Sequence, residues 1–476
     1  MRIKNIVAIS LLALLSLFGV QCTSSGYSTQ TGGEVTGRSQ AMLREPVPYG
    51  MVLVKRGSLR IGDESADSLW GSTSPAKEIS VESFWMDEKE ITNAQYHQFI
   101  NWVRDSIIRT RLAEEDESFL ITVDKNGEEL ATPHLNWSKP IPWKKATEDQ
   151  QNIINTLYYT NPITGERMLD VKQLNYRYEI FDYNQAALRK NRLDPQDRIK
   201  NTDQKVSGEK VMISKDTAYI TDDGQIIRRT EDRELKSLYD FVNTYIVNIF
   251  PDTTCWVNDF PNANNGTYAR IYFNHPNYND YPVVGVSWEQ ANAFCAWRTE
   301  LLLSNLGPQA RYIQRYRLPT EAEWEFAARG RENNVFPWKT DGSSDDEGCY
   351  YANFKPEKGN YTKDGSLITT KAGSYKPNSN GLYDMAGNVA EWTSTVYTEA
   401  GILQMNDMNP ELYYNAAPED PYYMKRKVVR GGSWKDPEKF IESSWRTFEY
   451  QNEQRSYIGF RCVRTQVGIA SSKRGK

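Results

Sequence analysis

Apolar side chains recur at helical spacing in three separate segments, and each segment opens on a similar polar pair. In each pair a Ser or Thr is followed by Gln or Glu three positions later: Thr92 and Gln95, Ser287 and Gln290, Thr320 and Glu323. Such a pair can form a capping box, which binds free backbone N–H groups at the start of a helix. Behind the first pair, Tyr96, Phe99 and Val103 fall on one helical face. The pattern predicts three helices, the last ending at Gly330, and a strand at Met51–Val54.

A long segment between the first two predicted helices, residues 104–278, carries elements of its own. Its charged start, Ile107–Leu120, has helical spacing, and Glu234–Ile249 predicts a second helix. Val211–Arg229 has the pattern of a β-hairpin with its turn at Asp223–Gly224. No motif in this segment indicates chemistry. Its mixed charge and aromatic content suit either a docking surface or a structural elaboration of the fold.

The chain begins with a pattern that is typical of export. Basic residues precede an apolar stretch that is too short, and too soon followed by polar sequence, for a membrane span. The stretch ends at Cys22 and resembles the lipobox of a bacterial lipoprotein. We expect residues 1–21 to be a lipoprotein signal peptide, Cys22 to be acylated and residues 22–46 to be a flexible tether. The alternative is an ordinary secretory signal with an incidental cysteine, because Gln21 stands where a lipobox usually has a small residue.

Composition narrows the class of protein. The net charge is −5, and no basic patch with interleaved aromatic residues is present, so we expect no nucleic-acid partner. The 13 Trp and 29 Tyr suit a loop-rich fold held together by large aromatic contacts. The 3 histidines lie in separate segments, which does not indicate a catalytic triad or a metal site. An exported chain can form disulfides, although spacing alone does not pair the cysteines that follow Cys22, which are Cys255, Cys295, Cys349 and Cys462.

Four segments of the second half combine Trp, Gly and acidic residues in an order that amphipathic patterning does not require. They read YRLPTEAEWEFAARG from Tyr316, GLYDMAGNVAEWT from Gly381, VVRGGSW ending at Trp434 and YIGFRC ending at Cys462. Together they resemble the formylglycine-generating enzyme, or sulfatase-modifying factor, domain family. The resemblance implies a loop-rich α+β fold, related to C-type lectins, with little regular secondary structure. Residues 47–103 and 279–468 would form this domain, with 104–278 as a large insertion and 469–476 as a basic tail.

In the resembling family, a cysteine pair just after the GGS turn carries the copper-dependent chemistry, because the thiolate is both metal ligand and nucleophile. The matching positions are Asp436 and Ile441. We therefore expect no catalytic residues and no copper. The alternatives are a copper or thiol oxidase of the formylglycine-generating type, an unrecognised hydrolase, or a periplasmic lipoprotein that binds a ligand in the family's cleft.

The resemblance also implies structural calcium and one disulfide. Calcium takes carboxylate and backbone oxygens from irregular loops. The residues matching the first family site are Asp384, Met385, Gly387, Val389 and Glu391, and those matching a second site are Asn353, Phe354, Asp364 and Ser366. The disulfide would join Cys295 to Cys462. The alternative to calcium is that Asp384 and Glu391 only cap local backbone and pair with arginine. For Arg317, Arg329 and Arg461 we favour structural pairing with Glu321, Glu325 or Glu391.

One branch of the family matches more closely than the rest. The segment YPVVGVSW, preceded by CWVNDFPN and YFNHPNYND, resembles gliding-motility lipoproteins of Bacteroidota. The chain length, the insertion and the lipoprotein start fit the GldK/PorK type. This resemblance implies a lipid-anchored protein on the periplasmic face of the outer membrane. It also implies self-association into a ring of the type IX secretion system, with a GldN/PorN-like periplasmic partner and without catalysis.

Overall fold

The computed structural model describes residues 44–63, 76–124, 127–199, 205, 208–306, 312–330 and 334–474. The predicted signal peptide, Cys22 and almost all of the predicted tether lie outside these ranges. The chain divides into two units, Met1–Arg44 and Glu45–Lys476. None of the described helices is long and apolar enough to cross a membrane.

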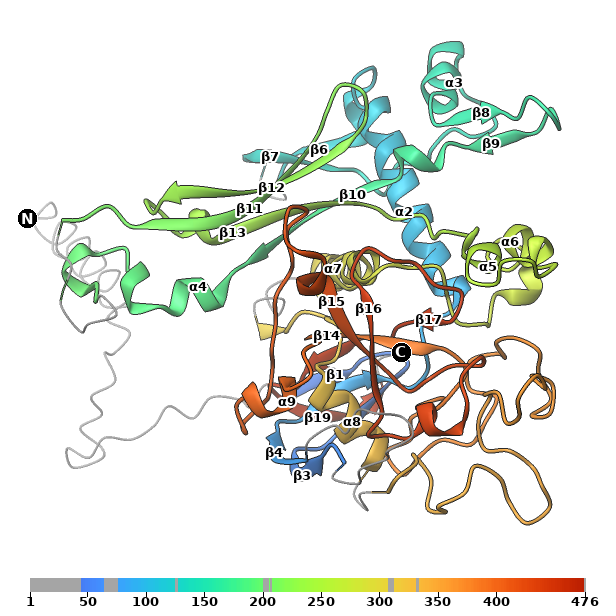
Figure 1. The fold of residues 1–476 in the computed structure, drawn as a ribbon. Helices are drawn as coiled ribbons and strands as arrows, with labels where there is room; N and C mark the ends of the chain where they lie inside the picture. Colours follow the sequence, from blue (N-terminus) through green and yellow to red (C-terminus); the bar gives the residue numbers. More distant parts are fainter. Residues whose placement is uncertain are drawn as a thin grey trace, which may run out of the picture. The chain divides into compact units, whose positions relative to one another are not determined.

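The elements of the fold are labelled in Figure 1. The α-helices are α2 (Asn93–Leu112), α3 (Glu148–Asn155), α4 (Tyr183–Ala187), α5 (Cys255–Asn258), α6 (Gly266–Ile271), α7 (Trp288–Leu306), α8 (Glu321–Arg329) and α9 (Gly401–Gln404). The strands of the first half are β1 (Arg44–Val47), β2 (Met51–Val54), β3 (Gly57–Ile61), β4 (Lys77–Val81), β5 (Phe84–Asp87), β6 (Leu120–Val123), β7 (Glu129–Leu135), β8 (Tyr158–Thr160), β9 (Arg167–Leu169) and β10 (Asn175–Phe181). The remaining strands are β11 (Met212–Ile220), β12 (Ile226–Glu234), β13 (Val242–Asn248), β14 (Ala390–Val396), β15 (Arg426–Arg430), β16 (Arg446–Tyr450), β17 (Ile458–Gly459), β18 (Val463–Thr465) and β19 (Ile469–Arg474).

Two small sheets organise the part of the fold that holds the family motifs. The first has the strand order β16-β15-β14-β17, with β15 antiparallel to both neighbours and β17 parallel to β14. Every residue of β14 is buried. The second sheet has the order β18-β5-β2, and the predicted strand at Met51–Val54 is its edge strand β2. Long irregular loops connect these sheets, as Figure 1 shows, and the predicted loop-rich α+β fold is confirmed.

The three predicted capped helices are present as α2, α7 and α8. At α8, the Thr320 hydroxyl accepts from Glu323 N at 3.1 Å and the Glu323 carboxylate accepts from Thr320 N at 2.9 Å. The same reciprocal bonds occur at the starts of α2 and α7. Gly330 follows α8 with φ of 63°, a left-handed conformation that glycine adopts without strain. Spacing within a few residues was therefore enough to locate these helices.

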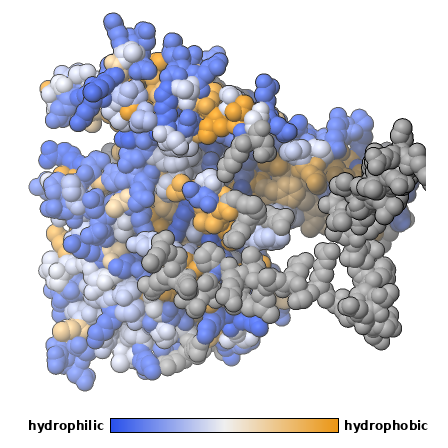
Figure 2. Space-filling view, turned by 180° about the vertical axis from the view of Figure 1, so that it is seen from behind, coloured by the Kyte–Doolittle hydropathy of each residue, from blue (hydrophilic) through white to orange (hydrophobic). Residues whose placement is uncertain are grey.

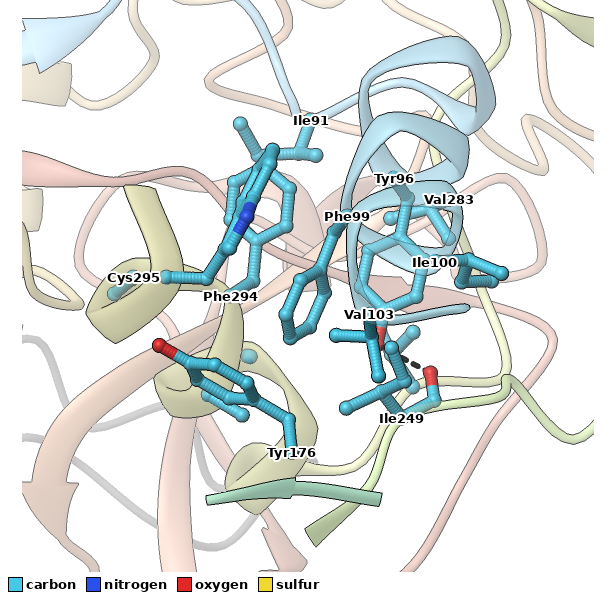
Figure 3. Packing of buried hydrophobic residues seen from close by; sticks show 14 of the residues in the cluster. Ile91, Tyr96, Phe99, Ile100, Val103, Tyr176, Ile249, Val283, Phe294 and Cys295 are labelled. Atoms are coloured by element: carbon cyan, nitrogen blue, oxygen red, sulfur yellow. Dashed lines mark hydrogen bonds between the residues drawn. The ribbon is translucent and has the colours of Figure 1, made fainter. Parts of the chain in front are cut away.

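Helices α2 and α7 pack through aromatic side chains, shown in Figure 3. The Tyr96 and Phe294 rings are stacked with centroids 5.7 Å apart, and Phe99 meets Phe294 edge to face at 5.8 Å. The Tyr96 hydroxyl donates to the carbonyl of Ile249 at 2.8 Å, the dashed line in Figure 3. Because Ile249 directly follows β13, this bond ties the end of that strand, within the predicted insertion, to the core. Tyr176 of β10 joins the same cluster by an edge contact with Phe99 at 5.2 Å.

Within residues 104–278, β10 pairs antiparallel with β13, and β11 forms a hairpin with β12. The hairpin and its turn were predicted, and Gly224 takes the left-handed conformation there with φ of 82°. We call the described residues between 175 and 248 the arm. The elements β10 to β13 run alongside one another, as Figure 1 shows.

One expectation for this segment was wrong, and another is confirmed only in part. The predicted helix Glu234–Ile249 is instead a short 3-10 turn, η6 (Leu238–Phe241), followed by strand β13. The sequence of β13, VNTYIVN, is rich in β-branched residues, and pairing with β10 satisfies its backbone. The helical stretch predicted from Ile107 to Leu120 is helical only as far as Leu112, where α2 ends. A 3-10 turn, η2 (Glu117–Phe119), and strand β6 follow.

Candidate functional site

The GGSW turn places Trp434 in an aromatic cluster. Gly431 and Gly432 have φ of 89° and 63°, which favours glycine at both positions. A Cβ at Gly432 would stand 2.6 Å from the carbonyl oxygen of Phe440, so the chain after the turn folds back closely onto it. The Trp434 ring lies 5.9 Å from that of Trp256 and 5.3 Å from that of Phe260. The two glycines therefore let the chain after the turn pack closely against it, and Trp434 packs against the rings of Trp256 and Phe260.

Asp436 and Ile441 occupy the positions of the family's thiols, and the side chains of both make structural contacts. The Asp436 carboxylate accepts from the Ser433 hydroxyl at 2.6 Å and from Lys435 Nζ at 2.5 Å. Its backbone carbonyl accepts from Lys355 N at 2.9 Å. Ile441 is fully buried in an apolar cluster that includes Phe354. The Asp436 side chain thus stabilises the turn and the Ile441 side chain packs in the apolar cluster, and neither residue has a thiol.

The loop that matches the first family calcium site is shaped by left-handed residues. Asp384, Gly387 and Asn388 have φ of 53°, 75° and 57°. A Cβ at Gly387 would overlap the carbonyl oxygen of Asn353, which itself accepts from Asn388 N at 2.7 Å. The Asp384 carboxylate accepts from Gly373 N at 2.5 Å through Oδ2, while its buried Oδ1 has no hydrogen-bond partner among the described residues.

The second carboxylate of this loop, that of Glu391, already has hydrogen-bond and ion-pair partners. Glu391 accepts from Arg461 Nε at 2.7 Å and Nη2 at 2.6 Å, and from Trp324 Nε1 at 2.7 Å. Both Glu391 and Arg461 are fully buried. The predicted arginine pairing of Glu391 is therefore present, and Oδ1 of Asp384 is the carboxylate oxygen of this loop that would be open to a cation.

A third buried carboxyl group, which the sequence did not point to, also lies in this region. Glu90 accepts from Asn388 Nδ2 at 3.0 Å and from Val389 N at 3.3 Å. Burial, together with Asp384 and Glu391, raises the pKa of Glu90 well above its usual value. Burial likewise raises the pKa of Asp384 to about 6. Glu90, Asp384 and Glu391 thus lie close to the guanidinium of Arg461, and Lys89 also acts on Asp384, so burial and mutual repulsion both favour the neutral forms of Glu90 and Asp384.

The residues of the second predicted calcium site also lie together. The Asp364 carboxylate accepts from Phe354 N at 2.7 Å and from Ser366 N at 3.1 Å. Asn353 donates through Nδ2 to the carbonyl of Ile368 at 3.0 Å. Both oxygens of Asp364 thus organise the local backbone. In the described part of the chain, no group of three or more His, Cys, Asp or Glu side chains has the arrangement of a metal site. Both calcium sites remain predictions.

The sulfur atoms of Cys295 and Cys462 face each other at 3.3 Å in the core, and both residues are buried. The structure thus brings together the two cysteines of the predicted disulfide without a bond between them, and the disulfide remains a prediction. Cys255 is also buried, whereas Cys349 is exposed.

Buried arginine–carboxylate pairs support the motif segments. As predicted, Arg329 pairs with Glu325 at 2.8 Å, whereas Arg317 pairs with Glu323, at 2.6 Å, and not with the glutamates that we expected. The pattern also did not reveal the fully buried Arg430, which reaches Glu325 at 2.5 Å and Glu321 at 3.3 Å. Arg430 lies in the VVRGGSW motif, so this network connects the turn to helix α8.

Comparisons with known proteins show the family to which the chain belongs. A family model described as "Sulfatase-modifying factor enzyme 1-like domain" matches residues 39–173 and 184–466. The chain belongs to this family of formylglycine-generating-enzyme-like domains. The match runs through most of residues 104–278 as well as the motif segments.

Curated relatives include both active and inactive members. The mouse "Formylglycine-generating enzyme" is 31% identical over 198 residues, which cover 40% of this chain and 46% of that protein. The mouse "Inactive C-alpha-formylglycine-generating enzyme 2" is 35% identical over 159 residues, covering 33% of this chain and 39% of that protein. The chain thus spans less than half the length of these relatives. Among solved structures, PvdO from Pseudomonas aeruginosa aligns with a TM-score of 0.42 and 15% identity, over 89% of this chain and 100% of that chain.

Proposed function

We propose that this protein is a non-catalytic outer-membrane lipoprotein of the GldK/PorK type. In this role it is a structural ring subunit of the type IX secretion and gliding machinery and assembles with a GldN/PorN-like periplasmic protein. The observation that carries the proposal is the state of the two thiol positions. Asp436 is bonded into the GGSW turn and Ile441 is packed into the core, so neither side chain can be a thiolate ligand. The similarity to relatives that are named inactive supports the same conclusion.

The rest of the fold suits a scaffold. The buried pairs of Arg430 and Arg461, together with the packed aromatic core, favour a rigid body over a mobile active site. Acylation of Cys22 would hold this body at the membrane, since two or more acyl chains anchor stably where one does not. Calcium, if bound at the Asp384 loop, would act as a structural tie between irregular segments.

Two measurements on the full chain test the proposal. The first is affinity purification from native membranes, in which a GldN/PorN-like protein should co-purify and the complex should be much larger than one copy of each chain. The second is incubation with copper and a cysteine-containing sulfatase peptide, in which no formylglycine should form. A monomer in the first measurement contradicts the scaffold role, and turnover in the second contradicts the loss of catalysis.

Membrane attachment has its own matched test. Cys22→Ala should move the protein from the membrane to the soluble fraction, whereas Cys349→Ala, at an exposed position, should leave it membrane-bound. Retention of the Cys22 variant on membranes would refute the lipid anchor.

A further inference from the structure

The end of the arm exposes several large apolar side chains. Tyr239 of η6 and Tyr183 of α4 are 81% and 76% exposed, and Leu238 and Met212 are each more than half exposed. These residues belong to neighbouring elements, since α4 and β11 both contact η6. Figure 2 shows a further broad apolar area along the arm. A monomer seldom leaves such a set of side chains in water unless the surface binds a partner.

Basic residues surround this apolar surface. Arg189, Lys190 and Arg192 are exposed on and just after the 3-10 turn that follows α4, η4 (Arg189–Asn191). Acidic residues also lie in this part of the arm: the carboxylates of Asp182 and Asp240 accept backbone N–H groups of their own turns at 2.7–2.9 Å, and Asp194 and Asp197 are exposed. We use the name arm-end surface for seven residues: Tyr183, Arg189, Lys190, Arg192, Met212, Leu238 and Tyr239. It combines aromatic anchors with positive charge, the residue types enriched at binding hot spots.

The arm-end surface rests on a small core of its own. Ile213, Leu235 and Phe241 are buried together, separately from the main core. The Phe181 ring lies 4.7 Å from that of Tyr183 and 6.1 Å from that of Phe241, linking the exposed side chain to this cluster. The surface is therefore held in place by packing.

One partly buried arginine, Arg228, connects the arm to the rest of the fold. Arg228 of β12 donates to Asp216 of β11 at 2.8 Å and to the side chain of Asn415 at 3.1 Å. It also donates to the backbone carbonyl of Ala416 at 3.1 Å, and pairs with Glu289 of α7 at 3.5 Å. Because these bonds join two arm strands to a core loop and a core helix, a partner bound at the arm end would be held at a defined angle to the core.

A surface of complementary charge lies at the far end of α2. Glu114, Glu115 and Glu117 are exposed there, and Ile121 and Val123 of the adjoining strand β6 are 42% and 47% exposed. We call these five residues the acidic surface. In Figure 1 the end of α2 and helix α4 are well separated, so the acidic surface and the arm-end surface of one molecule do not meet.

We propose that the arm-end surface of one copy docks onto the acidic surface of a second copy of this chain. The inference deepens the proposed scaffold function and rests on it, since the chain must self-associate. The two surfaces differ, so the contact is heterologous, and such contacts generate rings when the rotation between copies closes. The connection through Arg228 would make that rotation constant from copy to copy.

Charge reversal tests the contact in the full chain, in detergent, by sedimentation velocity over a range of concentrations. The arm-end variant carries Arg189→Glu, Lys190→Glu and Arg192→Glu. The acidic-surface variant carries Glu114→Lys, Glu115→Lys and Glu117→Lys. The control variant carries Lys144→Glu and Lys145→Glu, at exposed positions outside both surfaces. Each triple variant alone should raise the dissociation constant at least about tenfold, because like charges then oppose each other. Mixing the two variants should restore association, and the control should resemble the parent chain.

The outcomes separate this inference from the function on which it rests. A parent chain that stays monomeric overturns both the docking contact and the ring. A parent that assembles, with reversals that change nothing, overturns only the contact. Variants that weaken association singly and are not rescued when mixed show that the two surfaces do not face each other. Circular dichroism of each variant establishes that the fold is retained.

Discussion

Lys427 is a buried lysine whose ammonium group costs stability at neutral pH. Its side chain is fully buried, and Nζ lies 4.3 Å from the centre of the Trp288 ring and donates to the carbonyl of Tyr414. Burial lowers the pKa of Lys427 from 10.5 to about 7; Glu289 opposes this shift and Arg228 adds to it. Lys427→Met keeps the length and apolar stem of the side chain and removes the titrating group.

The shift sets the size and the sign of the effect. The change in the pKa of Lys427 from 10.5 to about 7 corresponds to an upper limit of roughly 4–5 kcal/mol in the free energy of unfolding. Between these two pKa values the unfolded chain binds more protons at Lys427 than the folded chain does. The free energy of unfolding therefore rises with pH in this window, and the full penalty applies below the folded pKa. The methionine variant also loses the cation–π contact with Trp288 and the hydrogen bond to Tyr414. This loss reduces its expected gain in the free energy of unfolding by about 1–2 kcal/mol.

Urea unfolding followed by tryptophan fluorescence, at several pH values across this window, measures the effect. We expect Lys427→Met to be more stable than the parent near neutral pH, and the difference to shrink by about 3 kcal/mol as the pH approaches 10. Groups that titrate in both proteins cancel in the comparison. Lys145→Met, at an exposed lysine, should follow the parent curve. Parallel curves for the parent and Lys427→Met would refute the reasoning.

Three other substitutions test the motif loops, with stability measured by thermal or urea unfolding. Gly387→Ala should destabilise by about 2–4 kcal/mol because φ is positive there and the new Cβ overlaps the Asn353 carbonyl; Gly224→Ala, in an open turn, should cost less. Arg461→Met should cost about 3–5 kcal/mol, since it leaves the Glu391 carboxylate buried and unpaired, and a cost below about 1 kcal/mol would contradict this pairing. If the loop binds calcium, chelation should lower the melting temperature of the parent and leave Asp384→Ala unaffected; a parent indifferent to chelator would remove the calcium prediction.

Features encoded over a few residues were predictable. The capping boxes of α2, α7 and α8 depend on side chains three positions apart, and the hairpin turn depends on Gly224. The helix predicted for Glu234–Ile249 failed for the opposite reason. Strand β13 exists because β10, far away in the chain, provides its hydrogen-bond partners.

The candidate site divides in the same way. Its segments could be located from the motifs, and the residues at the thiol positions, Asp436 and Ile441, could be read directly. The presence of Glu90 beside the Asp384 loop could not be predicted, because the two segments lie nearly 300 positions apart in the chain. The pairing of Arg430 with helix α8 also crosses more than 100 positions.

The sequence by itself determined the helix starts, the tight turns and the family positions that lack cysteine, because each depends on neighbouring residues or on identity at one position. The tertiary structure decided which carboxylates share one guanidinium, where β13 finds its partner and how Arg228 clamps the arm. Burial and long-range contact set those properties, and both arise only when distant segments pack together.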